Sequence, residues 1–237
     1  MIQCSGFDPL SFGQLLAPGQ SVPQGALTVF FNAPLSGRVF ENGASEILLL
    51  IDEPNSGQPA PVPGFGSQQP VTLCPGSSVC SAWAQQATIG GKTYAVAVNA
   101  PNASASPGNA APNAYQGVVG PDLVTFSNIP VLPPGTTGVR TFRVTNVRAG
   151  PGLPGTGVPV IASVLMTDNP QGGLIINQPL TVGNTEPSLT TSAAALFTLP
   201  GCLAQPLQQA TVLTYAERFN SAFKTRVDPT IAGQTSG

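Results

Sequence analysis

Short apolar runs, interrupted again and again by proline and glycine, most restrict what this chain can fold into. The 237 residues include 27 glycines and 26 prolines, which are spread along the sequence rather than gathered in one block. Both residues are unfavourable inside a helix, whereas short strands joined by Gly/Pro turns have this composition. The pattern therefore predicts an all-β protein.

The apolar runs are rich in β-branched residues, and they define the strands that we expect. In the best of them Phe142 and Val144 face one way and Arg143 and Thr145 the other, as the two-residue period of a strand requires. The expected strands cover residues 26–31, 46–51, 71–73, 93–98, 123–126, 139–147, 158–166, 174–176, 180–182, 194–199 and 210–215.

This succession of strands favours a predominantly antiparallel β-sandwich, immunoglobulin-like or jelly-roll-like. We expect one domain over residues 1–237; the alternative is two small sandwiches, 1–130 and 138–237. Long Pro/Gly or small-residue loops are expected at 56–69, 99–113 and 150–157.

One short helix is expected near the C-terminus. Within residues 215–224 the apolar side chains Tyr215, Phe219, Ala222 and Phe223 fall on one helical face, and the intervening Ala, Glu, Arg and Lys favour a helix. Phe219 and Phe223 also match the period of a strand, which is the alternative.

Charge is scarce, since 8% of residues are charged while 41% are hydrophobic, and the formal net charge is −2. Such a chain can bury a core and is not expected to be disordered. Nucleic acid binding needs a basic stripe, and the arginines are scattered apart from Arg140, Arg143 and Arg148. We therefore expect no nucleic acid partner.

Four cysteines suggest disulfides and a secreted or cell-surface protein. Cys74 and Cys80 flank a Pro-Gly turn that can bring them within bridging distance, which leaves Cys4 and Cys202 to pair by elimination. Free thiols in a cytosolic protein are the alternative. The spacing does not suit zinc.

The chain has no histidine. This excludes Ser–His–Asp and Cys–His catalysis in their usual form, so we expect no enzyme of that kind; a carboxylate glycosidase is the enzymatic alternative. No cofactor is expected except calcium, for which Asp52, Asp168 and Asn169 are weak candidates in turn-like segments.

Aromatic residues are the candidates for binding a glycan or another ligand. Trp83, Tyr94 and Tyr115 offer rings of the kind that stack on sugars. Trp83 follows Cys80 closely, and a lone tryptophan beside a disulfide also fits the core of an immunoglobulin-like sandwich.

No apolar run is long enough for a transmembrane helix, and the N-terminus has no basic and apolar leader. We expect the sequence to be a mature piece of a longer chain.

Two segments, Glu46 to Pro54 and Thr141 to Arg148 (TFRVTNVR), are similar to stretches of large secreted proteins of soil bacteria. Those proteins string immunoglobulin-like β-sandwiches in series. The resemblance implies an envelope or extracellular role, and it implies no active site.

These observations predict an extracellular structural or surface-assembly module, for example a subunit of a fibre or surface array. Its expected partners are copies of itself or other cell-surface proteins, and Ile2 to Gln20 is a candidate donor segment. The alternatives are an adhesive module that binds a glycan or another ligand and, less favoured, a histidine-free glycosidase.

Overall fold

The computed structural model describes residues 2–5, 16–54, 64–65, 69–74, 80–130, 139–150, 153, 155–169, 174–176, 179–195 and 211–218, and the description is confined to them. The chain divides into two compact units. Unit 1 comprises Met1–Leu153 and Val160–Gly183, and unit 2 comprises Pro154–Pro159 and Asn184–Gly237. The alternative domain boundary considered from the sequence, at 130–138, falls between two strands that belong to the same sheet.

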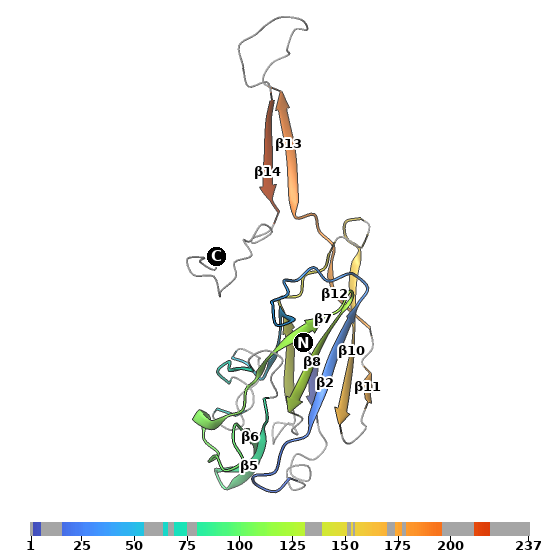
Figure 1. The fold of residues 1–237 in the computed structure, drawn as a ribbon. Helices are drawn as coiled ribbons and strands as arrows, with labels where there is room; N and C mark the ends of the chain where they lie inside the picture. The colour runs from blue at the N-terminus through green and yellow to red at the C-terminus, as the bar shows by residue number, and fades with distance from the viewer. Residues whose placement is uncertain are drawn as a thin grey trace, which may run out of the picture. The chain divides into compact units, whose positions relative to one another are not determined.

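A ten-stranded, almost entirely antiparallel sheet dominates the molecule (Figure 1), which confirms the all-β class. Its path is β1-β9-β3-β7-β8-β2-β10-β11, with β12 paired to β10 and the short β4 parallel to β7. The strands are β1 (Ile2–Ser5), β2 (Gln24–Phe31), β3 (Ala44–Ile51), β4 (Leu73–Cys74), β7 (Ala114–Val119), β8 (Leu123–Pro130), β9 (Val139–Thr145), β10 (Pro159–Asn169), β11 (Leu174–Ile176) and β12 (Leu180–Asn184).

Alternation of side chains sets the inward face of this sheet. In β2 the buried positions alternate, so that Leu27, Val29 and Phe31 face the core. The antiparallel register places Leu27 opposite Phe126 and Val29 opposite Val124 on β8, and both partners are fully buried. A register slip of one residue would turn this whole apolar set outward.

The sheet is curled. Strands β9 and β10 are separated in its order by β3, β7, β8 and β2, yet Phe142 of β9 and Ala162 of β10 belong to the same buried cluster as Val29 of β2. The core therefore lies between facing parts of one curved sheet. The finer assignment, immunoglobulin-like or jelly-roll-like, stays a prediction.

A separate hairpin completes the described part of unit 1. Strands β5 (Trp83–Ile89) and β6 (Lys92–Val98) pair in register through a two-residue turn. Gly90 and Gly91 both have positive φ, at 57° and 78°, as a type I′ turn requires. Both faces of the hairpin are used, because Val96 and Val98 pack with Phe65 on one side and Ala84 packs with Val22 on the other.

One of the expected loops, 99–113, is described in full, and the other two are described in part. Residues 99–113 are held by hydrogen bonds from Asn99 N–H to the Asn109 carbonyl and from Ala111 N–H to the Ala97 carbonyl. They include a short 3₁₀ turn, η1 (Pro107–Asn109). Most of 56–69 lies outside the described residues.

Unit 2 contains one antiparallel hairpin, β13 (Leu189–Ala195) with β14 (Thr211–Glu217). The expected helix is wrong for Tyr215 to Glu217, which belong to β14. Their hydrogen-bonding partner is β13, a pairing that the local sequence does not reveal. The rest of the expected helix, beyond Arg218, lies outside the described residues.

Thr185 anchors the chain just ahead of this hairpin, in an arrangement that we call the Thr185 clamp. Its carbonyl accepts from Gly157 N–H at 2.7 Å, and its own N–H donates to the Val158 carbonyl at 2.9 Å. Its hydroxyl donates to the Gly155 carbonyl at 2.8 Å and accepts from Val158 N–H at 2.9 Å. One threonine thus makes four hydrogen bonds with the 155–158 segment.

Candidate functional site

The arginine group that stood out in the sequence is neutralised by carboxylates from β3 and the turn that follows it. Arg140 contacts Asp52 at 2.6 Å, and Arg148 contacts Glu46 at 3.2 Å. Because β9 lies beside β3 in antiparallel register, the arginines and the carboxylates are brought together where these two strands run side by side.

Arg143 completes this row by pairing with Glu53, whose carboxylate is buried. These arginines therefore balance carboxylates of the same chain and do not form an unpaired basic stripe for a polyanion.

Both carboxylate oxygens of Asp52 are used within this pairing. Asp52 is buried and has a φ of 49°, in the left-handed region. One carboxylate oxygen accepts from Arg140, and the other accepts from Thr141 N–H at 2.9 Å. Its carbonyl also accepts from Gln69 N–H at 2.8 Å. The calcium candidate of the sequence is thus an internal counter-ion.

The other two calcium candidates, Asp168 and Asn169, lie at the end of β10, and their side chains are outside the described part. Among the residues that the structure describes, no group of three or more His, Cys, Asp or Glu side chains is arranged to hold a metal. A cavity of about 40 Å³ beside Asp52, Asn113 and Arg140 has space for water.

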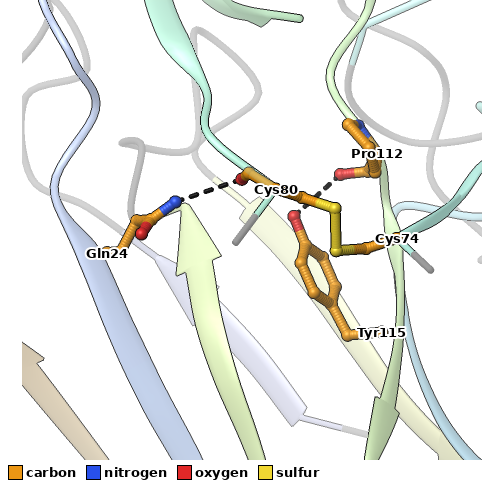
Figure 2. The surroundings of a disulfide bond; sticks show 5 residues. All are labelled: Gln24, Cys74, Cys80, Pro112 and Tyr115. Carbon is orange, nitrogen blue, oxygen red and sulfur yellow. Dashed lines mark hydrogen bonds between the residues drawn. A yellow bond between two sulfur atoms is a disulfide. The ribbon is translucent and has the colours of Figure 1, made fainter. Parts of the chain in front are cut away.

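The disulfide joins Cys74 and Cys80 as expected, with 5.8 Å between their Cα atoms. Figure 2 shows it against the ring of Tyr115. The Gln24 side chain donates to the Cys80 carbonyl at 3.1 Å, which ties the disulfide loop to β2. Cys4 is in β1, opposite Arg140, whereas Cys202 lies outside the described residues, so their pairing stays a prediction.

Tyr115 is a core residue rather than a surface ring. It is 2% exposed, and its hydroxyl donates to the Pro112 carbonyl at 3.0 Å (Figure 2). Burial raises the pKa of this phenol well above its usual range. The ring is therefore not available for stacking on a ligand at the surface.

Trp83 and Tyr94 lie on the same face of the β5–β6 hairpin, because Trp83 is opposite Val98 and Tyr94 opposite Ala87. Both are half-buried against the cluster that contains Phe65, Val96 and Val98. Their placement fits the core interpretation that the sequence offered for Trp83. The structure does not bring Tyr115 together with them as one ligand-binding platform.

An apolar groove of about 650 Å³ lies inside the curl of the main sheet. Its walls come from β9 on one side and from β2, β10 and β12 on the other. No charged side chain lines it. We call it the β9–β12 groove, and its lining includes Val29, Phe31, Phe142, Val144, Val147, Val160, Ala162, Val164, Leu180 and Val182.

No protein family, curated protein or solved structure matches this chain. The case for its function therefore depends on its own geometry.

The β12 wall of the groove is exposed. Leu180 and Val182 are 49% and 57% exposed, and every residue of β12 is open to solvent. In the described part of the chain, no strand pairs with the edge of β12 that faces away from β10. On the other wall, β1 covers only Val139 to Phe142 of β9. The groove therefore lies next to two incompletely paired strand edges.

Sequence reasoning identified the strands that form this groove but not the groove itself. The inward side of β9 was visible as Phe142 and Val144, and Leu180 and Val182 alternate in the same way along β12. What was missing was the curl that brings β9 opposite β10 and β12, which depends on pairings between distant strands. Within the described residues, no helix has the length and apolarity needed to span a bilayer.

Proposed function

We propose that this protein is an extracellular structural module that assembles with copies of itself through uncovered β-surfaces. One observation carries the proposal: the β13–β14 hairpin stands as a two-stranded sheet with its apolar side chains exposed. Leu213 and Tyr215 are each 61% exposed, and no third strand pairs with either edge in the described part. An isolated two-stranded hairpin is at best marginally stable in water, so this one needs an external surface.

The hairpin is amphipathic in a way that suits docking. Cross-strand partners share a face, and the register pairs Thr191 with Tyr215 and Ala193 with Leu213. One face therefore carries Leu213 and Tyr215 together, with Leu189 and its cross-strand partner Glu217 at the base of the hairpin. The opposite face has only small or β-branched side chains, namely Thr190, Ser192, Ala194, Val212, Thr214 and Ala216.

The edges of the hairpin are not protected against strand addition. Soluble β-proteins guard free edges with charged residues, above all lysine, with proline or with bulges. Between Leu189 and Ala195, and between Thr211 and Ala216, the hairpin has no charged residue and no proline. Charges occur only at its base in the described part of the chain, where Glu217 ends β14 and Arg218 and Glu186 lie 3.7 Å apart.

The extracellular assignment draws on the disulfide and on the composition. Structural disulfides persist in oxidising compartments and are rare in the cytosol, and the Cys74–Cys80 bridge is formed here. The low charge, at 8% of residues, is also unlike that of a typical cytosolic domain.

Sedimentation velocity and electron microscopy of the purified chain over a rising concentration series test the proposal. We expect oligomers that grow with concentration and that persist in 1 M salt, where the Debye length falls to about 3 Å and ion pairs at a surface are screened. A strictly monomeric protein up to millimolar concentration would overturn the proposal.

A further inference from the structure

We propose that the β13–β14 hairpin of one copy docks in the β9–β12 groove of a second copy, so that the chains join head to tail. This inference rests on the proposed function and goes further, because it names the two surfaces that meet. The two surfaces belong to different parts of the same sequence, and each is left incomplete in the described structure.

Both surfaces expose large hydrophobic side chains to solvent. Nine large hydrophobic side chains are exposed among the described residues, and four of them lie on these surfaces. Leu180 and Val182 belong to the wall of the groove, and Leu213 and Tyr215 belong to the hairpin. The other five are Phe30, Val39, Val71, Leu73 and Val118, none of which lines the groove.

The sizes are compatible. The groove encloses about 650 Å³, compared with roughly 30 Å³ for one water molecule in the liquid, so it can receive several large side chains. Leu213 and Tyr215 are two positions apart on one strand and project from the same face. They form a compact apolar pair that enters from one direction.

Hydrogen bonding and charge point to the same occupant. The open edge of β12 and the part of β9 beyond Phe142 have backbone N–H and C=O groups that can pair with an added strand, next to the apolar lining of the groove. A strand added there gains main-chain hydrogen bonds together with side-chain burial, which is the logic of β-strand addition. Glu217 is the only charged residue of the two strands and lies at their base. Docking of the part that carries Leu213 and Tyr215, with Glu217 left at the rim, therefore puts no unpaired ion in the uncharged groove.

The geometry of such a contact decides the form of the assembly. Hairpin and groove are different surfaces, so the contact is heterologous, and each added copy presents a new free hairpin or a new free groove. Contacts of this kind produce rings if the rotation closes and open filaments if it does not. After one such contact forms, each of the two copies still has one binding surface free, either its hairpin or its groove.

Two single substitutions test this, each at a side chain more than half exposed so that folding is preserved. Val182→Glu places a charge in the groove, and Leu213→Glu places one on the apolar face of the hairpin. The matched controls are Val118→Glu, at a position 52% exposed on β7, and Thr214→Glu, on the opposite face of the hairpin. Circular dichroism checks that all four variants keep the strand content of the parent.

We expect Val182→Glu and Leu213→Glu each to weaken self-association by roughly 30-fold or more, as loss of a hot-spot contact does, while the controls assemble like the parent. Mixing the two defective variants is the decisive step. The first retains its hairpin and the second its groove, so the mixture should form a one-to-one dimer that grows no further.

The remaining outcomes separate this inference from the proposed function. If Leu213→Glu is monomeric while Val182→Glu still assembles, the hairpins bind each other and the groove assignment is overturned, although self-assembly stands. A mixture that stays monomeric also overturns the head-to-tail contact. If the parent chain never associates, both proposals fail.

Discussion

The main sheet and the β13–β14 hairpin are made from similar residues but differ in where their apolar side chains go. In the main sheet Leu27, Leu49 and Phe126 are at most 1% exposed, whereas Leu213 and Tyr215 of the hairpin are 61% exposed. Strand-forming residues alone therefore do not decide whether a β-element is complete. The sheet is stabilised by facing parts of its own curl, and the hairpin has no such cover in the described part of the chain.

The sharpest way to test this contrast is to remove one large side chain from each region. Phe126→Ala empties a fully buried position on β8 and should destabilise the chain by about 3–5 kcal/mol. Tyr215→Ala removes an exposed ring and should change the unfolding free energy of the monomer by less than about 0.5 kcal/mol. Urea unfolding followed by circular dichroism at low protein concentration measures both. Equal costs would mean that the hairpin is already packed within its own chain.

Ion pairs offer a second comparison between the regions. Asp52→Asn leaves Arg140, itself only 19% exposed, without its counter-ion, and should cost about 2–3 kcal/mol, somewhat below the figure for a fully buried pair because of that exposure. Glu186→Gln breaks a pair whose members are 45% and 55% exposed and should cost at most about 1 kcal/mol. Denaturation midpoints compare them. An Asp52→Asn variant as stable as the parent would show that the row along β3 and β9 contributes little.

Both cysteines of the disulfide belong to unit 1, whereas the β13–β14 hairpin belongs to unit 2. Removing the disulfide in the double variant Cys74→Ser, Cys80→Ser should cost about 2 kcal/mol in the chain-entropy estimate for so short a loop. Fluorescence of Trp83, the only tryptophan, reports unfolding of unit 1. Under conditions where unit 1 of the double variant stays folded, we expect the variant to assemble as the parent does. Loss of assembly in a folded double variant would connect the disulfide loop to the contact between copies.

The smallest expected effect concerns Tyr115. Burial raises the pKa of its hydroxyl in the folded state above the value of about 10 found in an unfolded chain. The stability that follows from this is fully present below pH 10 and is lost as the pH rises further, because only the unfolded chain then readily releases the proton.

Tyr115→Phe should remove that part of the alkaline loss and cost about 1 kcal/mol at neutral pH, since the Pro112 carbonyl loses its donor. Unfolding free energies of parent and variant between pH 8 and 11 measure the difference. Parallel curves would contradict the assignment.

Local sequence patterns correctly predicted the features that depend on residues close together in the chain. The alternation in β9 and the Cys74–Cys80 bridge were both visible, because each follows from residues a few positions apart. Strands β5 and β7 were not expected. The first is rich in Ala and Gln, and the second contains Gly117, and such residues have low strand propensity. Their strand structure comes from pairing with β6 and with β3 and β8.

Features that depend on contacts between distant segments could not be predicted from the sequence. From the sequence, Asp52 was interpreted as a turn residue and a weak calcium candidate. Its actual partner, Arg140, is 88 positions away and could not be recognised from the local sequence. The predicted helix over Tyr215 failed for a related reason, since β14 is defined by its pairing with β13. The groove likewise arises only when β9 and β12 are brought to face each other by the curl.

The Thr185 clamp gives the molecule a mechanical property. A force that pulls on the hairpin travels along Glu186 to Ser188 and meets Thr185 before it reaches β12. There the four hydrogen bonds to the 155–158 segment resist it. The load is thereby shared between β12 and the 155–158 segment, and less of it acts on Leu180 and Val182. In a chain of head-to-tail copies, a pull from one neighbour would thus be spread over β10 and β12 together, the two paired strands that line the groove for the next copy.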